Sequence, residues 1–274
     1  MSIEANLKKL FSLEGKVILI TGAAGGIGAA LSKGMAGVGG IMCNCDISEK
    51  GLKALEDEIA KEGGQSKSYI LDVTNRDNIQ SVIDSIVKEF GTIDVLVNVA
   101  GINKREGFMD VNEETYDRIM DINLKSVFFL TQAVVPHMMK KHSGSIINIG
   151  SHNATAMLGG CSVYGATKSG VVGLTRSMAV EWAEWGIRAN AVSPGHILTP
   201  LTQVTWDHPT RGDYLRDRIA MRRPGNTDEL LGIVVLLASD ASSYMSGSNY
   251  VVDGGCLCGG MPWDYDSAYR YKQP

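Results

Sequence analysis

The feature that most constrains the fold is an alternation of short apolar segments with longer amphipathic ones, repeated along the whole chain. The apolar segments are typical of strands buried on both faces of a parallel sheet. Seven are candidate strands: residues 16–22, 41–46, 68–73, 93–101, 145–151, 187–195 and 249–255. Strands separated by helices require crossover connections, so the sequence predicts a single α/β domain, residues 1–274, with a doubly wound parallel seven-stranded sheet.

The amphipathic segments begin with residues that are typical of helix N-termini. Side chains able to cap a helix precede four of them: Ser48, Thr74 or Asn75, Asn112 and Thr227. The segment after Asn112 is long enough for one long or broken helix. In a sheet of this type, ligands bind beyond the carboxyl ends of the strands. The candidate functional residues are therefore those that directly follow each strand.

Charge and hydropathy exclude several classes of partner. The formal net charge of −4 offers no broad basic surface, so no nucleic acid partner is expected. No apolar run approaches the roughly 18–20 residues needed to span a bilayer. The N-terminus lacks the apolar core of a secretory signal, and we expect a cytoplasmic protein without a membrane partner.

The cysteines favour neither disulfides nor a metal site. There are five, an odd number: Cys43, Cys45, Cys161, Cys256 and Cys258. Cys43 and Cys45 lie two residues apart in a predicted strand, hence on one face, and are interpreted as core residues. No matching histidine cluster accompanies the C-x-C pairs, so no metal is expected.

A glycine-rich stretch follows the first predicted strand. Gly22, Gly26 and Gly28 have the spacing G-x-x-x-G-x-G and lie between a buried strand and a helix. Glycines there let the backbone turn sharply and approach a pyrophosphate, whose charge is stabilised by the helix N-terminus. The context favours a dinucleotide over a plain tight turn.

Asp46 ends the second predicted strand, 18 residues after Gly28. A carboxylate at this position accepts hydrogen bonds from an adenosine ribose and repels the 2′-phosphate of NADP. Gly25 and Ile47 supply no basic side chain to offset that repulsion. The sequence therefore favours NAD as cofactor, with a simple turn cap as the alternative role of Asp46.

Two further segments belong to the predicted cofactor site. Asp72 and Val73 follow the third strand and are expected to border the adenine. In the NVAG segment after the fourth strand, small residues let the backbone pass beneath a cofactor; the candidates are Asn98, Ala100 and Gly101.

Tyr164 and Lys168 lie one helical turn apart, at the start of the helix after the fifth strand. A nearby cation favours phenolate, so Lys168 is expected to lower the pKa of Tyr164 towards a value suited to proton transfer. Ser151 ends the fifth strand and is expected to hydrogen-bond the same substrate oxygen. Asn123 lies inside a predicted helix, although asparagine has a low helix propensity. It is interpreted either as a structural amide or as part of a proton path from Lys168 to solvent.

These motifs resemble, in order and spacing, those of the short-chain dehydrogenase/reductase family: TGAAGGIG, NVAG, Asn123, Ser151, YGATK and the PG of AVSPGHILT. The resemblance runs from about residue 12 to 255. It implies a Rossmann-type fold with strand order 3-2-1-4-5-6-7, a homotetramer, and Asn123, Ser151, Tyr164 and Lys168 as the catalytic group. It also implies cofactor contacts from Ile27 in the glycine loop, from Tyr164, from Lys168, which would bind the nicotinamide ribose, and from Pro194, Gly195, Ile197 and Thr199. One departure is Val99, where the family often has a second asparagine.

The segment AGINKREGFMDV is similar to the sugar-acid branch of the family, the gluconate and deoxygluconate dehydrogenases. That similarity implies that Arg105 or Lys104 holds a substrate carboxylate, a role suited to the arginine fork. His152, Asn153 and His196 are further substrate candidates, and residues 196–224 match the family's substrate lid.

Other functions stay open on the sequence alone. A polyol/ketose pair of the sorbitol or arabinitol type fits nearly as well as a sugar acid. A hydroxysteroid or carbonyl reductase, or a non-catalytic NAD-binding scaffold, are more distant alternatives. The C-terminal extension, residues 256–274, is rich in aromatic residues and is expected to dock on a neighbouring subunit.

Overall fold

Seven strands form one sheet in the computed structural model, which describes residues 3–200 and 202–259. All neighbours pair in parallel, and the order is β3-β2-β1-β4-β5-β6-β7. The strands are β1 (Val17–Thr21), β2 (Ile41–Asp46), β3 (Gln65–Ile70), β4 (Val95–Asn98), β5 (Gly144–Ile149), β6 (Ile187–Pro194) and β7 (Asn249–Val252). The predicted doubly wound α/β architecture and strand order are confirmed.

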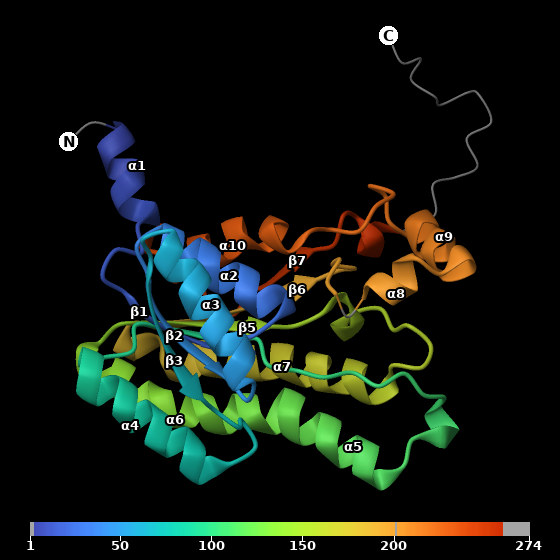
Figure 1. The fold of residues 1–274 in the computed structure, drawn as a ribbon, viewed down its shortest axis with the longest axis horizontal. Helices are drawn as coiled ribbons and strands as arrows, with labels where there is room; N and C mark the ends of the chain where they lie inside the picture. The colour runs from blue at the N-terminus through green and yellow to red at the C-terminus, as the bar shows by residue number, and fades with distance from the viewer. Residues whose placement is uncertain (1–2, 201, 260–274) are drawn as a thin grey trace.

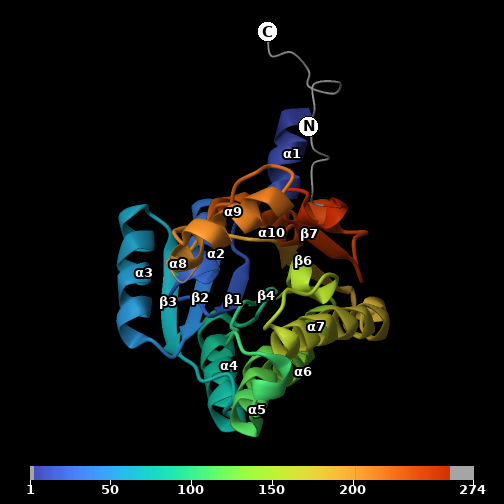
Figure 2. The same ribbon diagram turned by 90° about the vertical axis from the view of Figure 1, so that its right-hand side faces the viewer.

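Helices cover both faces of the sheet (Figures 1 and 2). One core lies between the sheet and α4, α6 and α7, and the other lies between the sheet and α2, α3 and α10. The helices are α1 (Ile3–Phe11), α2 (Gly26–Gly37), α3 (Glu49–Lys61), α4 (Arg76–Phe90), α5 (Glu113–Met120), α6 (Ser126–Lys141), α7 (Ser162–Glu181), α8 (Gln203–Trp206), α9 (Pro209–Arg218) and α10 (Leu231–Ala238). Ser48, Asn75 and Asn112 accept hydrogen bonds at the starts of α3, α4 and α5, as expected of N-caps.

Several predicted boundaries differ from the structure: β4 covers Val95–Asn98 rather than 93–101, and β7 ends at Val252 rather than at residue 255. The third strand was expected over residues 68–73, but β3 begins at Gln65 and ends at Ile70. The pairing of Gln65 with Ile41 sets this register, and because β3 is an edge strand, polar residues are tolerated along it. The expected cap Thr227 is instead the first residue of a 3₁₀ turn that leads into α10, and Asn226 caps this turn.

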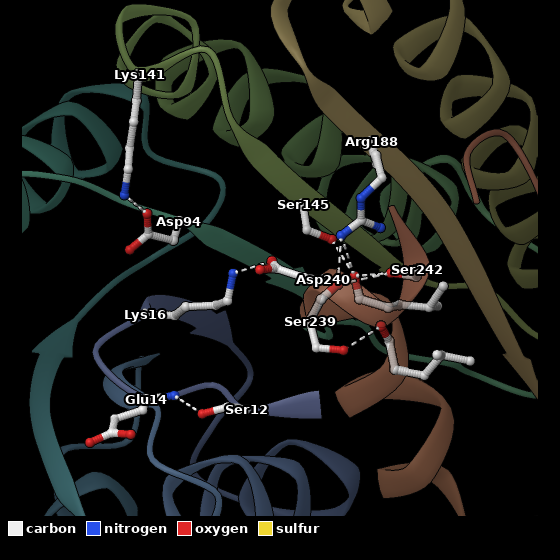
Figure 3. Close-up of polar contacts among 12 residues, drawn as sticks. Ser12, Glu14, Lys16, Asp94, Lys141, Ser145, Arg188, Ser239, Asp240 and Ser242 are labelled. Atoms are coloured by element: carbon white, nitrogen blue, oxygen red, sulfur yellow. Dashed lines mark hydrogen bonds and ion pairs between the residues drawn. The ribbon is translucent and has the colours of Figure 1, made fainter. Parts of the chain in front are cut away.

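The end of the sheet opposite the candidate functional residues is held by a network of polar contacts (Figure 3). Arg188 donates to the carbonyls of Leu237 (3.0 Å) and Ser239 (3.2 Å) at the C-terminal end of α10. Ser145 donates to the same Leu237 carbonyl at 2.7 Å. Asp94 accepts from the backbone N–H of Val17 and pairs with Lys141. These contacts tie the starts of strands to each other and to α10.

The cysteines follow expectation where the structure tests them. Cys43 and Cys45 are fully buried in the core, and all five cysteines are free thiols. In residues 3–200 and 202–259, no helix is long and apolar enough to cross a membrane. The predicted docking of the C-terminal extension concerns mainly residues 260–274, which lie outside the described residues.

Candidate active site

The glycine loop joins the end of β1 to the start of α2. Gly22 has a positive φ of 66°, which favours glycine. A Cβ on Gly28 would lie 2.0 Å from the carbonyl oxygen of Gly22, so only glycine fits there. The N-cap of α2 is Gly25, which offers no side chain to the first-turn N–H groups. The loop therefore leaves the N-terminus of a twelve-residue helix open to a phosphate group, as dinucleotide binding requires.

Asp46 faces this loop from the end of β2. Its Oδ2 accepts from the backbone N–H of Ala24 at 3.0 Å, and its Oδ1 accepts from that of Ser48 at 2.9 Å. Asp46 thus fixes the loop and caps the following turn. A carboxylate has about four acceptor positions, so two remain for ribose hydroxyls.

The segments after β3 and β4 differ in how they present the predicted residues. The exposed Asp72 accepts from the backbone N–H and the hydroxyl of Thr74, both with Oδ1. Asn98 directs its amide inward, to Asn148 Oδ1 at 2.8 Å. Only the backbone of Asn98 remains for the predicted cofactor contact. Ala100 lies directly against Gly22, whose added Cβ would be 3.0 Å from the Ala100 Cα.

Tyr164 and Ser151 meet at the carboxyl end of β5. Their side chains are hydrogen-bonded, and the Ser151 hydroxyl also accepts from the backbone N–H of Asn153 at 3.1 Å. Burial raises the pKa of Tyr164 above its ordinary value of 10.0, while the hydrogen bond with Ser151 lowers it. The expected net lowering is therefore wrong for the protein without ligands, because desolvation of the phenolate outweighs the opposing contact.

Lys168 lies beside Tyr164 and is almost completely buried. Its Nζ is 5.7 Å from the Tyr164 ring centroid and donates to the carbonyl of Ile149 at 2.7 Å. Burial lowers the pKa of Lys168 to about 8. A Cβ on Gly101 would lie 3.7 Å from Nζ, which places the ammonium under the loop after β4. The two buried groups thus favour their neutral forms more than free side chains do.

Asn123 occupies a π-helical turn, Asp121–Lys125, between α5 and α6. It is fully buried, accepts from the Ile102 N–H at 2.8 Å and donates to the Ile102 carbonyl at 2.8 Å. The predicted long helix is therefore continuous but locally widened, a feature that is frequent at functional sites. The side chain clamps the loop after β4 beside Lys168, which supports the structural role considered for Asn123.

A row of aromatic rings forms the wall next to Ser151. The ring centroids of His152 and His196 are 4.6 Å apart, and those of His196 and Trp206 are 6.1 Å apart. Burial lowers the pKa of both histidines, that of His196 to about 4. The neighbouring Asn153 is only 4% exposed. Three of the predicted substrate residues are thus adjacent and uncharged at neutral pH.

The two basic candidates after β4 differ in their partners. Lys104 pairs with Glu106 at 2.6 Å and donates to Thr115 at 3.2 Å. Arg105 is exposed, and its charge contributes to lowering the pKa of His196. Of the pair, Arg105 is the cation whose charge acts on a histidine of the ring wall.

The two ends of the segment 196–224 lie next to each other. Gly225 donates to the His196 carbonyl at 2.9 Å and accepts from the Leu198 N–H at 2.7 Å. A Cβ on Gly26 would lie 3.7 Å from Thr199, so the first part of the segment faces the glycine loop. Ile197 is buried, and the Pro194 carbonyl hydrogen-bonds His152 at 3.2 Å. The start of the segment thus lies beside the glycine loop, at Thr199.

Sequence reasoning missed Trp206. It is 6% exposed and forms a small core with Leu215 and Ile219. A tryptophan in an otherwise polar segment was the available signal. It also missed Thr21, whose hydroxyl accepts from the N–H groups of Val99 and Ala100 and joins the ends of β1 and β4.

Comparisons with known proteins extend over nearly the whole chain. A family model described as enoyl-(acyl carrier protein) reductase matches residues 22–256. A 3-oxoacyl-[acyl-carrier-protein] reductase of Thermotoga maritima is 42% identical over 245 residues, 89% of this chain and 99% of the relative. The 2-dehydro-3-deoxy-D-gluconate 5-dehydrogenase of Escherichia coli is 40% identical over 255 residues, which cover 90% of this chain and 97% of the relative. The crystal structure of a gluconate 5-dehydrogenase from Burkholderia cenocepacia, in complex with NADP and tartrate, superposes with a TM-score of 0.89 at 34% identity, covering 92% and 99%.

Proposed function

The chain belongs to the short-chain dehydrogenase/reductase family, and from that premise we propose that it is an NAD-dependent dehydrogenase of a gluconate-type sugar acid. The observation that carries the reaction type is the assembly of Ser151, Tyr164 and Lys168 at one strand end, beside an open helix N-terminus. The substrate class rests on the ring wall and Arg105.

The residues divide the chemistry between them. When bound, the nicotinamide cofactor supplies the acceptor or donor of hydride at a carbinol or carbonyl carbon. Tyr164 holds or removes the proton at the substrate oxygen, and Ser151 hydrogen-bonds that oxygen as charge develops. Lys168 favours the phenolate when Tyr164 acts as base. Asn123 holds the loop that closes this group.

Support for NAD comes from Asp46, because its carboxylate lies against the glycine loop where an adenosine ribose is expected. The similar Burkholderia protein is in complex with NADP, so the preference needs a direct test.

Replacing Asp46 with asparagine is expected to weaken NAD binding about tenfold and to narrow the discrimination against NADP by a larger factor. The amide retains an acceptor for the Ala24 N–H but removes the charge that binds ribose hydroxyls and repels a 2′-phosphate. Dissociation constants for both cofactors, from fluorescence titration of wild type and variant, provide the measurement. An unchanged NAD/NADP ratio would contradict the role of Asp46 in cofactor choice.

Support for a sugar acid comes from two kinds of side chain: uncharged polar groups after β5 and a cation in the loop after β4. The uncharged His152 and Asn153 suit hydroxyl groups, and the exposed Arg105 suits a carboxylate. The Burkholderia relative is in complex with tartrate, itself a hydroxy acid. An acyl thioester would place an apolar chain against this polar wall.

NADH formation across gluconate-type acids, neutral polyols and hydroxysteroids tests the substrate class. We expect turnover of a sugar acid, and an increase in its KM of at least about tenfold in Arg105→Leu. Lys104→Leu is the matched control, because Lys104 is engaged by Glu106 and its loss should leave that KM nearly unchanged. Turnover of neutral polyols alone, with no effect of Arg105→Leu, would replace the sugar acid by a polyol.

We also propose a homo-oligomer, with the tetramer as the expected form. A groove of about 370 Å³ lies on α6 and α7, with Phe128, Val135, Leu174 and Trp182 among its lining. Such an apolar groove between two helices supports association between copies of the chain. The cytoplasmic location remains a prediction.

A further inference from the structure

Two buried atoms beside Ser151 lack hydrogen-bond partners: Nε2 of His152 and Oδ1 of Asn153. The two residues are 6% and 4% exposed. Buried polar atoms in native proteins nearly always have a partner, and leaving one without costs about 1–3 kcal/mol. Two such atoms on consecutive residues, next to a residue that contacts Tyr164, indicate that a ligand supplies the missing partners.

Both atoms are acceptors. The Nδ1 of His152 lies 3.2 Å from the Pro194 carbonyl, and because a carbonyl only accepts, Nδ1 carries the hydrogen. In a neutral imidazole the other nitrogen, Nε2, is then an acceptor. Burial lowers the pKa of His152, so the ring is neutral at pH 7. The oxygen of Asn153 accepts as well.

We propose that His152 Nε2 and Asn153 Oδ1 form a subsite for hydroxyl groups on the carbons next to the reacting carbon, so that the enzyme selects vicinal diols over simple secondary alcohols. The inference deepens the proposed function and rests on it for the position of the reacting oxygen. Each hydroxyl group donates its one hydrogen to one acceptor, whereas a carboxylate, keto or thioester oxygen brings only a second acceptor. The subsite therefore directs a substrate carboxylate away from itself, towards Arg105.

The neighbouring rings keep this subsite uncharged and fixed. His196 packs on His152, and Trp206 packs on His196 from the lid segment. The charged groups that act on these histidines are Asp253, which raises their pKa, and Arg105, which lowers that of His196. Desolvation is the largest influence on both rings, and it favours the neutral acceptor form.

Butane-2,3-diol and butan-2-ol test the subsite independently of any sugar acid. Wild type is expected to prefer the diol by at least about tenfold in kcat/KM with saturating NAD, since one hydrogen bond to a buried acceptor is restored. In Asn153→Leu, which removes one of the two acceptors at similar volume, the diol-to-alcohol ratio should fall. Asn153→Asp retains an acceptor oxygen and should restore part of the preference.

The same ratio is measured with His152→Phe, which keeps a ring against His196 but removes Nε2. Circular dichroism and NAD affinity report whether each variant folds. If the diol-to-alcohol ratio is unchanged in folded Asn153→Leu and His152→Phe, the two residues have a merely structural role and the proposal is overturned. No preference of wild type for the diol, in turnover or in binding to the NAD complex, also overturns it. Diol preference without turnover of gluconate-type acids would retain the subsite and reject the sugar acid.

Discussion

Tyr164→Phe is expected to lower kcat by about 10²–10⁴-fold, the range typical of a lost general acid/base. The substitution removes only the hydroxyl, so the ring keeps its place at the start of α7 and beside Lys168. NAD affinity should change little, because the glycine loop and Asp46 are untouched. Single-turnover NADH formation with a substrate identified among the acids, polyols and hydroxysteroids measures the rate. An NAD titration measures the affinity.

The pH profile sharpens this test. Without ligands, burial keeps the Tyr164 pKa above 10.0, so the phenol is protonated at neutral pH. Alcohol oxidation needs the phenolate, and its rate in wild type should therefore rise towards alkaline pH. The residual rate of Tyr164→Phe should lose that dependence. A variant with wild-type kcat would remove Tyr164 from the chemistry, and a variant that no longer binds NAD would leave a positioning role only.

Lys168→Met is expected to lower kcat by about 10- to 1,000-fold and, at the same time, to stabilise the protein without ligands. The kinetic loss follows from removing a cation beside Tyr164 that favours the phenolate when Tyr164 acts as base. The gain in stability follows from burial, because folding lowers the Lys168 pKa from 10.5 to about 8. Each unit of pKa corresponds to about 1.36 kcal/mol, so burying the charged lysine lowers the free energy of unfolding by at most about 3 kcal/mol at pH 7.

The stability difference has a defined pH window. Below pH 8, Lys168 is protonated in the folded and unfolded states, and the full cost of burying the charge is present. Between pH 8 and 10.5 the unfolded chain binds more protons than the folded one, so wild-type stability rises with pH. The advantage of Lys168→Met should shrink across that window. Urea denaturation at pH 7 and pH 10 measures it, and a variant less stable than wild type at pH 7 would contradict the burial argument.

Much of the fold was predictable, because local physics dictates it. Continuous apolar runs identify β1, β4, β5 and β6, which are buried strands inside the sheet. Caps such as Ser48 and Asn75 act within a few residues of the helix they start. The edge strand β3 was predicted with the wrong bounds, because its register is set by pairing with β2 rather than by its own apolar pattern.

The sequence by itself determined the chain's architecture and the chemical types at its strand ends: a glycine loop, an acidic residue after β2, and a serine, tyrosine and lysine around α7. Spacing and residue chemistry are sufficient for that. Only the tertiary structure decided the electrostatics, because desolvation depends on neighbours distant in sequence. It raised the pKa of Tyr164, lowered that of Lys168, and directed the Asn98 amide into the core. It also left His152 and Asn153 with buried acceptors, since a side chain's hydrogen-bond partners are fixed only when the fold closes around it.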